Sequence, residues 1–246
     1  MSKICIIIPV YNEEFRWMAR DFTQHLSKYS THHFLFVNDC STDNTAAKIS
    51  ELQQKFPMQV NYISLERNQG KAEAVRQGFI EAFKSDYEVV GFMDADLATP
   101  LSEVEPLVNK LLANSVYSMV FGSRIKLLNL DLHRNLKRHY LGRIFATFVS
   151  LLFKWQIYDT QCGAKFFKKN ELSNSVFSQP FISKWFFDVE IFLRLQQFSD
   201  KPLEQIALES PLNQWIERGK SKLKWSDFFA APFQLLRIKS SYKSKV

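Results

Sequence analysis

Residues 4–13 read ICIIIPVYNE, a run of seven apolar residues that ends in a tyrosine, an asparagine and a glutamate. A continuous apolar run of this length is typical of a β-strand buried on both faces of a sheet. Such strands occur in parallel sheets that are covered by helices on both sides. The opening residues therefore predict the first strand of an α/β domain, with a polar loop at its carboxyl end.

The chain that follows alternates helix-like and strand-like segments. Residues 13–29, 45–56 and 71–84 have helical character, and the runs at 33–37, 60–64 and 88–93 have strand length. This alternation predicts a mostly parallel sheet with right-handed crossovers and helices on both faces. Ligands of such sheets bind beyond the carboxyl ends of the strands, so functional motifs are expected directly after strands.

The second half of the chain is less regular. Residues 116–121 and 160–167 resemble strands, whereas residues 127–156 and 185–198 have helical character. A chain of 246 residues suits one large domain better than two very small ones. We therefore expect a single α/β domain over residues 1–246.

Composition excludes several classes of protein. Hydrophobic residues make up 46% and charged residues 23% of the chain, values typical of a globular protein. No apolar run reaches the length of about 20 residues that spans a bilayer. The three cysteines form no CxxC pair or disulfide framework, which favours a cytoplasmic protein. The net charge of +7 favours an anionic partner such as a phosphate or a lipid headgroup.

Four polar clusters follow the four predicted strands and should meet at one edge of the sheet. They are PVYNE at 9–13, NDCSTD at 38–43, RNQGK at 67–71 and DAD at 94–96. Asp94 and Asp96 would point to the same side of an extended chain, where two carboxylates can ligate Mg²⁺ or Mn²⁺. An isolated Asp-x-Asp is usually a solvated turn, but the other three clusters favour a metal site that binds a diphosphate.

The second and third clusters suit a nucleotide. Ser41–Thr45 contains favoured helix N-cap residues, and Asp39 just before them could accept a hydrogen bond from a base or a ribose. Gly70 and Lys71 stand at the start of a predicted helix, where a flexible backbone and a cation can contact a diphosphate. Nucleic acid would explain the basic charge but not the carboxylates, so we expect no nucleic-acid partner.

These motifs, in this order, resemble those of the family 2 inverting glycosyltransferases. Later segments add to the resemblance: GSR at 122–124, DTQCGAK at 159–165 and WFFDVE at 185–190. Together they are similar to the branch that glycosylates dolichyl or other polyprenyl phosphates. The resemblance covers roughly residues 4–225. It implies a GT-A (Rossmann-like) fold, a UDP-sugar donor, a glucosyl group and a polyprenyl phosphate acceptor.

The resemblance also implies roles for individual residues. Residues 1–125 would form the nucleotide-sugar half, residues 126–225 the acceptor half and residues 226–246 a basic aromatic C-terminal segment. Asp94 and Asp96 would hold the metal, and Asp94 would also contact the donor. The nucleotide would be held by Pro9, Tyr11, Glu13, Asp39 and Lys71. The sugar and the acceptor would be lined by Arg124, Gln161 and Asp188.

The acceptor decides whether the reaction needs a base. A sugar hydroxyl must lose a proton during attack, and Asp188 is the candidate base for that reaction. A lipid phosphate is largely ionised near pH 7 and needs positioning instead. The alternative for Asp188 is a helix-face carboxylate paired with a nearby lysine or arginine. The sequence leaves three alternative functions open. They are transfer to a sugar hydroxyl, a nucleotidyltransferase reaction and a catalytically silent binding module.

Two basic amphipathic segments could bring the chain to a membrane surface. Residues 126–155, with Arg138 and Arg143, and residues 225–243 combine basic and apolar side chains. Each could bind the surface of a bilayer or pack as a core helix with a solvated basic face. Arg143 could also neutralise an acceptor phosphate. We therefore expect a cytoplasmic protein that can lie peripherally on the cytoplasmic face of a membrane.

Overall fold

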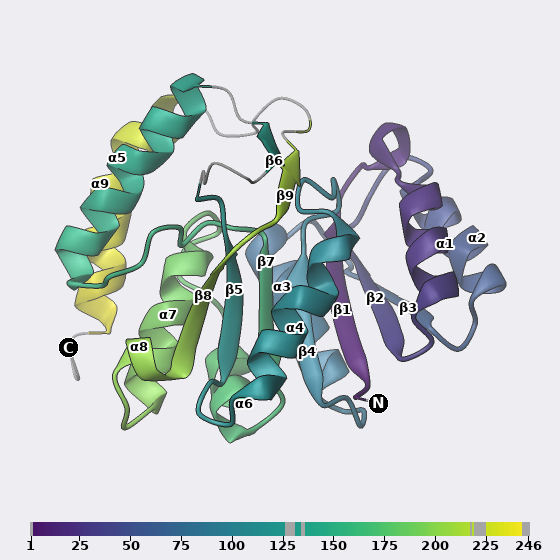
Figure 1. Cartoon of the computed structure of the whole chain (residues 1–246). Helices are drawn as coiled ribbons and strands as arrows, with labels where there is room; N and C mark the ends of the chain where they lie inside the picture. Colours follow the sequence, from purple (N-terminus) through teal and green to yellow (C-terminus); the bar gives the residue numbers. More distant parts are fainter. Residues whose placement is uncertain (1, 126–130, 134–135, 217, 219–224, 243–246) are drawn as a thin grey trace.

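The computed structural model describes residues 2–125, 131–133, 136–216, 218 and 225–242, with the backbone alone for 131–133, 136–141 and 225–230. Within these residues a central sheet has the order β3-β2-β1-β4-β7-β5-β8 (Figure 1). Its strands are β1 (Ile4–Val10), β2 (His32–Asn38), β3 (Val60–Ser64), β4 (Val89–Met93), β5 (Met119–Ser123), β7 (Ala164–Lys168) and β8 (Ala207–Pro211). Strand β7 alone is antiparallel to both of its neighbours, so the predicted mostly parallel sheet is confirmed.

Helices cover both faces of this sheet, as expected. Alternate residues of β1 enter two separate cores, with Ile6 and Ile8 in one and Cys5 and Ile7 in the other. The first core is closed by α1 (Ala19–Lys28), α2 (Thr45–Lys55) and α4 (Val104–Ala113). The second is closed by α3 (Lys71–Ala82), α6 (Glu171–Ser178) and α7 (Phe187–Phe198). Short helices at Glu14–Arg16 (η1), Leu101–Glu103 (η2) and Leu203–Ile206 (α8) complete this part of the fold.

Two longer helices stand beside the sheet. Helices α5 (Leu136–Phe153) and α9 (Trp225–Ser241) run side by side at one edge of the molecule (Figure 1). Val149 and Phe153 of α5 share a core with Leu235 and Ile238 of α9. Among the described residues, no helix is both long enough and apolar enough to cross a bilayer. A small parallel pair, β6 (Asp131–His133) and β9 (Gln214–Ile216), lies above the carboxyl end of the sheet (Figure 1).

The structure moves several predicted boundaries. Strands β1 and β3 have the predicted bounds, whereas the helix expected from residue 13 begins as α1 at Ala19, after the short η1. Strand β7 begins at Ala164 rather than at residue 160, and Gly163 just before it lies against Asp94, which follows β4. The helix expected within residues 127–156 is α5, which begins at Leu136. Tertiary contacts rather than local propensity decide these boundaries.

Candidate active site

The four predicted loops meet where the chain order of the sheet reverses. The chain passes from β1 to β2 and β3 on one side, and β4 returns to the other side of β1. In an open α/β sheet this switch point forms a crevice beyond the carboxyl ends of the strands. The loops after β1 and β4, which carry PVYNE and DAD, therefore flank the crevice directly. Pro9 is the second last residue of β1, and the Tyr11 side chain that follows is 38% exposed.

Asp39 ties the second loop to the third. Its Oδ1 accepts a hydrogen bond from Gln69 N at 2.7 Å, and its Oδ2 accepts one from Gly70 N at 2.8 Å. The side chain is buried. Gly70 has a φ of 93°, a conformation that glycine adopts without strain, and it caps the start of α3. Asp39 thus fixes the backbone that presents Lys71, and contact of Asp39 with a base or a ribose stays a prediction.

The first loop is bound to the second in the same way. Asn12 N donates to Ser41 Oγ at 3.1 Å, and Glu13 N donates to Thr45 Oγ1 at 2.8 Å. Asn12 Oδ1 in turn accepts from Thr42 N at 2.9 Å. Glu13 is buried, and its Oε1 accepts from an arginine three residues on. These bonds make the three loops one rigid wall, which suits the binding of a nucleotide.

Asp94, Asp96 and Lys71 form the charged centre of the crevice. Lys71 Nζ makes an ion pair with Asp94 Oδ1. Burial would lower the pKa of Lys71, but the nearby carboxylates, Asp94 and Asp188 foremost, raise it above its usual value. Burial and the charge of Asp94 raise the pKa of Asp96. The raised pKa of Asp96 means that its ionised form is disfavoured here, and a cation bound beside it would offset that effect.

The absence of a side chain at Gly163 leaves room for the carboxylate of Asp94. A Cβ atom at Gly163 would lie 2.1 Å from Asp94 Oδ2, closer than any real side chain approaches an oxygen. The carboxylate is thus seated against the bare backbone of the segment that precedes β7. Two carboxylates in such a cradle fit Mg²⁺ or Mn²⁺, which bind through one or two carboxylates together with phosphate oxygens. Within the described ranges, no set of three His, Cys, Asp or Glu side chains could hold a metal ion.

Asp188 is not a free carboxylate. Its Oδ1 accepts a hydrogen bond from Lys165 Nζ at 2.5 Å, and the same ammonium donates to Cys162 O at 2.6 Å. Both residues are buried, with exposed fractions of 0% for Lys165 and 4% for Asp188. The ion-paired alternative raised for Asp188 is therefore what the structure contains, although Asp188 still lies close enough to Lys71 to influence its pKa.

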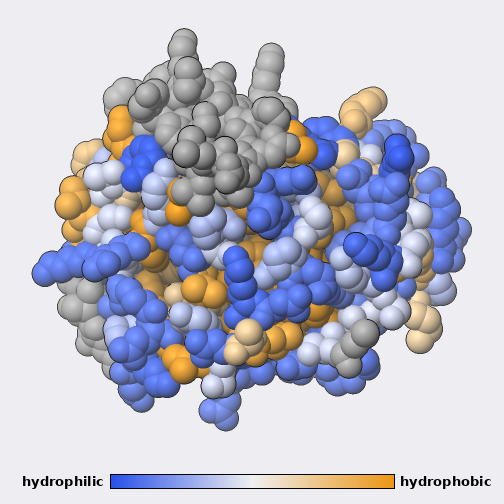
Figure 2. All heavy atoms as spheres, in the orientation of Figure 1, coloured by the Kyte–Doolittle hydropathy of each residue, from blue (hydrophilic) through white to orange (hydrophobic). Residues whose placement is uncertain are grey.

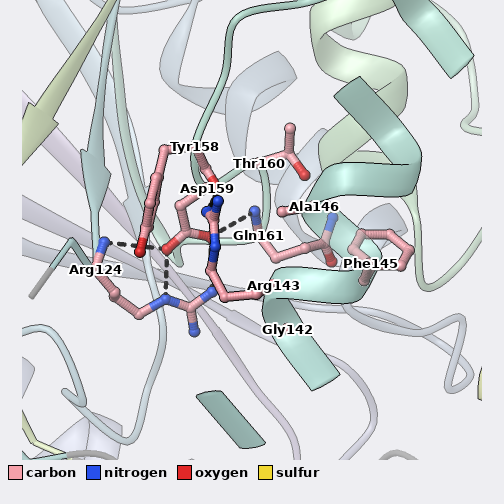
Figure 3. Close-up of a pocket in the computed structure, with 9 residues that line it drawn as sticks. All are labelled: Arg124, Gly142, Arg143, Phe145, Ala146, Tyr158, Asp159, Thr160 and Gln161. Atoms are coloured by element: carbon pink, nitrogen blue, oxygen red, sulfur yellow. Dashed lines mark hydrogen bonds and ion pairs between the residues drawn. The ribbon is translucent and has the colours of Figure 1, made fainter. Parts of the chain in front are cut away.

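Arg124 and Gln161 come together in a pocket beside this centre (Figure 3). Asp159 accepts hydrogen bonds from Arg124 Nε at 2.6 Å, Nη2 at 2.8 Å and N at 3.1 Å. Burial would raise the pKa of Asp159, but the Arg124 guanidinium lowers it to about 2. The cavity measures about 50 Å³ and lies between α5 and residues 158–161. Asp94 contributes to the electrostatic environment of Arg124, so the pocket adjoins the acidic centre.

The pocket also holds Arg143 and two unsatisfied polar groups. The Arg143 guanidinium lies 3.7 Å from the centre of the Tyr158 ring (Figure 3). Buried atoms Thr160 Oγ1 and Gln161 Nε2 have no hydrogen-bond partner among the described residues. Buried polar groups are nearly always paired, so these two atoms are available to an ordered water molecule or a polar ligand. Arg143 thus faces the pocket rather than a solvated helix surface, whereas the side chain of Arg138 lies outside the described residues.

Sequence reasoning assigned no role to several residues of this site. Lys165 stands in an apolar strand, where a lysine signals a buried partner, but only the fold identifies the partner as Asp188. Glu209 accepts hydrogen bonds from Tyr158 N at 2.9 Å and from Asp159 N at 2.8 Å. Nothing in the run ALESP at 207–211 predicts this contact.

Comparison with known proteins identifies the family of this chain. The model of the family described as glycosyl transferase family 2 matches residues 5–174. The dolichyl-phosphate beta-glucosyltransferase of Dictyostelium discoideum is 32% identical over 95% of this chain and 72% of its own length. The enzyme of the same name from Homo sapiens is 31% identical over 90% of this chain and 74% of its own length.

Solved structures share the fold. Glucosyl-3-phosphoglycerate synthase from Mycobacterium tuberculosis, solved in complex with Mn²⁺, uridine diphosphate and glucosyl-3-phosphoglycerate, superposes with a TM-score of 0.71. The match covers 98% of this chain and 80% of that chain, at 17% identity. At that identity the likeness shows the architecture alone, and the expected GT-A fold is confirmed. The family model and the relatives agree, and this chain therefore belongs to glycosyl transferase family 2.

Proposed function

We propose that this enzyme transfers glucose from UDP-glucose to a dolichyl-type polyprenyl phosphate. The observation that carries the proposal is the pocket lined by Arg124, Arg143, Thr160 and Gln161, which offers the Arg143 guanidinium and two unsatisfied polar atoms within the electrostatic influence of Asp94. An anionic group can be bound there next to the donor site. The names of the relatives, dolichyl-phosphate beta-glucosyltransferases, support the same donor sugar and acceptor.

The donor would occupy the crevice at the switch point. The wall formed by the loops at 9–13, 38–43 and 67–71 would hold the nucleoside, with Pro9, Tyr11 and Glu13 on the β1 side. The start of α3, at Gly70 and Lys71, would face the diphosphate. Mg²⁺ or Mn²⁺ would be held by Asp94 and Asp96 with the donor phosphates, and when bound it supplies positive charge for the leaving diphosphate.

The residues of the chain then favour a phosphate as acceptor. An oxygen of the lipid phosphate forms the new bond to the anomeric carbon, and the bond from that carbon to the diphosphate breaks, releasing UDP with inversion. This oxygen is already ionised near pH 7 and carries no proton to remove. Asp188, held by Lys165, accordingly has no proton-transfer role in this reaction. Transfer to a sugar hydroxyl would instead require a free base.

Turnover of a panel of nucleotide sugars tests the proposal. We expect UDP release from UDP-glucose that requires both a divalent cation and a short-chain polyprenyl phosphate. Asp188→Asn should lower the melting temperature, because Lys165 loses its buried partner, but the folded variant should retain most of the kcat, because no base is needed. Transfer that requires Asp188 and a glycan hydroxyl would favour the polysaccharide alternative. Release of pyrophosphate from a nucleoside triphosphate would show a nucleotidyltransferase.

We also propose that α5 and α9 lie on the cytoplasmic face of a membrane. Exposed apolar side chains recur on both helices, Ile144 and Leu151 on α5 and Phe233 and Leu236 on α9, each 50% exposed or more. Figure 2 shows apolar side chains at the edge that these helices form in Figure 1. Arg237 is exposed beside them and suits anionic headgroups. This surface would bring the acceptor pocket, which α5 lines, close to the lipid.

A further inference from the structure

Arg143 is the cation that remains available to a ligand in the acceptor pocket. Arg124 is neutralised by its bonds to Asp159, and among the described residues no carboxylate pairs with Arg143. An arginine presents five N–H donors in a planar fork that matches the oxygens of a phosphate. Its long side chain, however, must be held in one orientation for the fork to meet the phosphate oxygens.

Tyr158 supplies that orientation. We propose that Tyr158 is a positioning residue whose ring holds the Arg143 guanidinium in place for the acceptor phosphate, an inference that rests on the proposed function. The guanidinium carbon lies 3.7 Å from the ring centre, and Arg143 Nη1 donates to Tyr158 O at 3.3 Å. Stacking on the ring covers one face of the guanidinium and leaves N–H edges for a ligand (Figure 3).

The position of Tyr158 is itself fixed from the sheet. Glu209 of β8 accepts hydrogen bonds from Tyr158 N and Asp159 N, and also from Ser123 Oγ of β5 at 2.6 Å. One carboxylate thus fastens the loop to two neighbouring strands, β5 and β8. Tyr158 is therefore held on the rigid part of the fold, whereas α5, which carries Arg143, stands beside the sheet.

A second bond keeps α5 in register with this loop. Ser150 Oγ donates to Ile157 O at 3.1 Å, one residue before Tyr158. Ser150 and Arg143 are seven residues apart and lie on the same face of α5. The helix therefore contacts the loop at two points two turns apart. Of these two contacts, the stacking of Arg143 on Tyr158 lies nearer the pocket.

Kinetics with a short-chain isoprenyl phosphate test the role of Tyr158. In Tyr158→Leu, which removes the ring, we expect the KM for the isoprenyl phosphate to rise about tenfold. The KM for UDP-glucose should change less than twofold, and kcat should fall much less than the acceptor KM rises. Tyr158→Phe keeps the ring and should restore most of the acceptor affinity.

A double-mutant cycle separates positioning from a general structural role. If Tyr158 acts through Arg143, then Tyr158→Leu should have almost no further effect on the acceptor KM in an Arg143→Ala background. Glu209→Gln, which weakens the anchor of the loop, should raise the acceptor KM in the same direction as Tyr158→Leu. This variant also keeps the inference testable if Tyr158→Leu does not fold.

The outcomes distinguish failure of this inference from failure of the proposed function. If the unaltered enzyme does not glucosylate the isoprenyl phosphate, then the proposed function is wrong and the inference falls with it. If it does so, an unchanged acceptor KM in Tyr158→Leu, or full additivity of the Tyr158 and Arg143 substitutions, overturns the inference alone. A rise in the UDP-glucose KM equal to the rise in the acceptor KM would also overturn it.

Discussion

The backbone of Gly163 lies directly against the carboxylate of Asp94, so that a Cβ atom at Gly163 would stand 2.1 Å from Oδ2 and 2.4 Å from Cγ. Asp94 and Gly163 are far apart in the sequence, and the antiparallel pairing of β7 with β4 brings them together. Asp94 therefore takes its orientation from Gly163 as well as from β4, which it follows directly.

Gly163→Ala should displace this carboxylate. We expect the affinity for UDP-glucose in the presence of Mn²⁺ to fall at least tenfold, because the added methyl group cannot coexist with Asp94 in its present position. Overpacking of this kind costs about 1–3 kcal/mol in stability. Calorimetric titration with UDP-glucose and a thermal melt measure the two effects. Donor affinity equal to that of the unaltered protein would show that Asp94 is oriented by other contacts.

Asp96→Asn should separate metal binding from folding. The pKa of Asp96 is raised by burial and by Asp94, so the ionised side chain disfavours the folded state near pH 7. Removal of its charge should leave the stability of the metal-free protein unchanged or slightly higher. Stabilisation by Mn²⁺ with UDP should be lost. Thermal melts with and without these ligands test both expectations, and a full ligand-induced shift in the variant would contradict the metal assignment.

Asp39→Asn should loosen the loop before Lys71. The two oxygens of Asp39 accept from Gln69 N and Gly70 N, and an amide can supply only one acceptor. Loss of one bond to a charged acceptor costs about 1.5–3 kcal/mol. We expect weaker UDP binding in titration calorimetry together with a lower melting temperature. Asp86→Asn serves as a control, because that carboxylate is exposed; equal effects in the two variants would contradict the role of Asp39.

Mild acid should destabilise the fold through buried histidines. The ring nitrogens His25 Nε2 and His32 Nδ1 lie 2.8 Å apart, and His32 Nε2 lies 2.8 Å from Glu105 Oε1. Burial, with the charges of His32 and Lys28, lowers the pKa of His25 to about 3. Burial also lowers the pKa of His32, although Glu105 opposes the shift.

The sign of this pH dependence follows from the lowered pKa values of His25 and His32. Between pH 3 and the ordinary histidine pKa of about 6.5, the unfolded chain binds more protons than the folded one. Stability is therefore fully present above pH 6.5 and declines as the pH falls below it, by roughly 2 kcal/mol near pH 5 for one such histidine. Urea unfolding from pH 7.5 to 5 should show this slope, and His25→Asn should reduce it. An identical slope in the variant would rule out His25 as its source.

The surface of α5 and α9 should bind lipid through its apolar side chains. Leu151→Glu and Phe233→Glu, alone or combined, should weaken binding to anionic vesicles at least tenfold, since each apolar side chain contributes about 1.5–3 kcal/mol when buried. Met58→Glu is the matched control, because Met58 is 82% exposed on another part of the molecule. Equal losses in all three variants, or none in the first two, would exclude this surface in a vesicle flotation assay.

The local sequence predicts the strands and loops of residues 4–96. The apolar runs at 4–10 and 60–64 have the bounds of β1 and β3, because a strand buried on both faces needs such a run whatever surrounds it. The polar loops after these strands were also predictable as one crevice. Parallel strands bring their carboxyl ends to one edge of the sheet, so a position next to a strand is enough to place a loop.

The partners of the buried carboxylates depend on the tertiary fold. Three contacts join elements that the sequence pattern does not pair. They are Asp188 with Lys165, Asp159 with Arg124, and Glu209 with residues 158–159. Periodicity shows which face of an element is buried, but the partner of a buried charge depends on strand order and register. The sequence therefore predicts where the crevice lies. The fold pairs Asp188 with Lys165 and places Arg143 at the pocket beside Arg124.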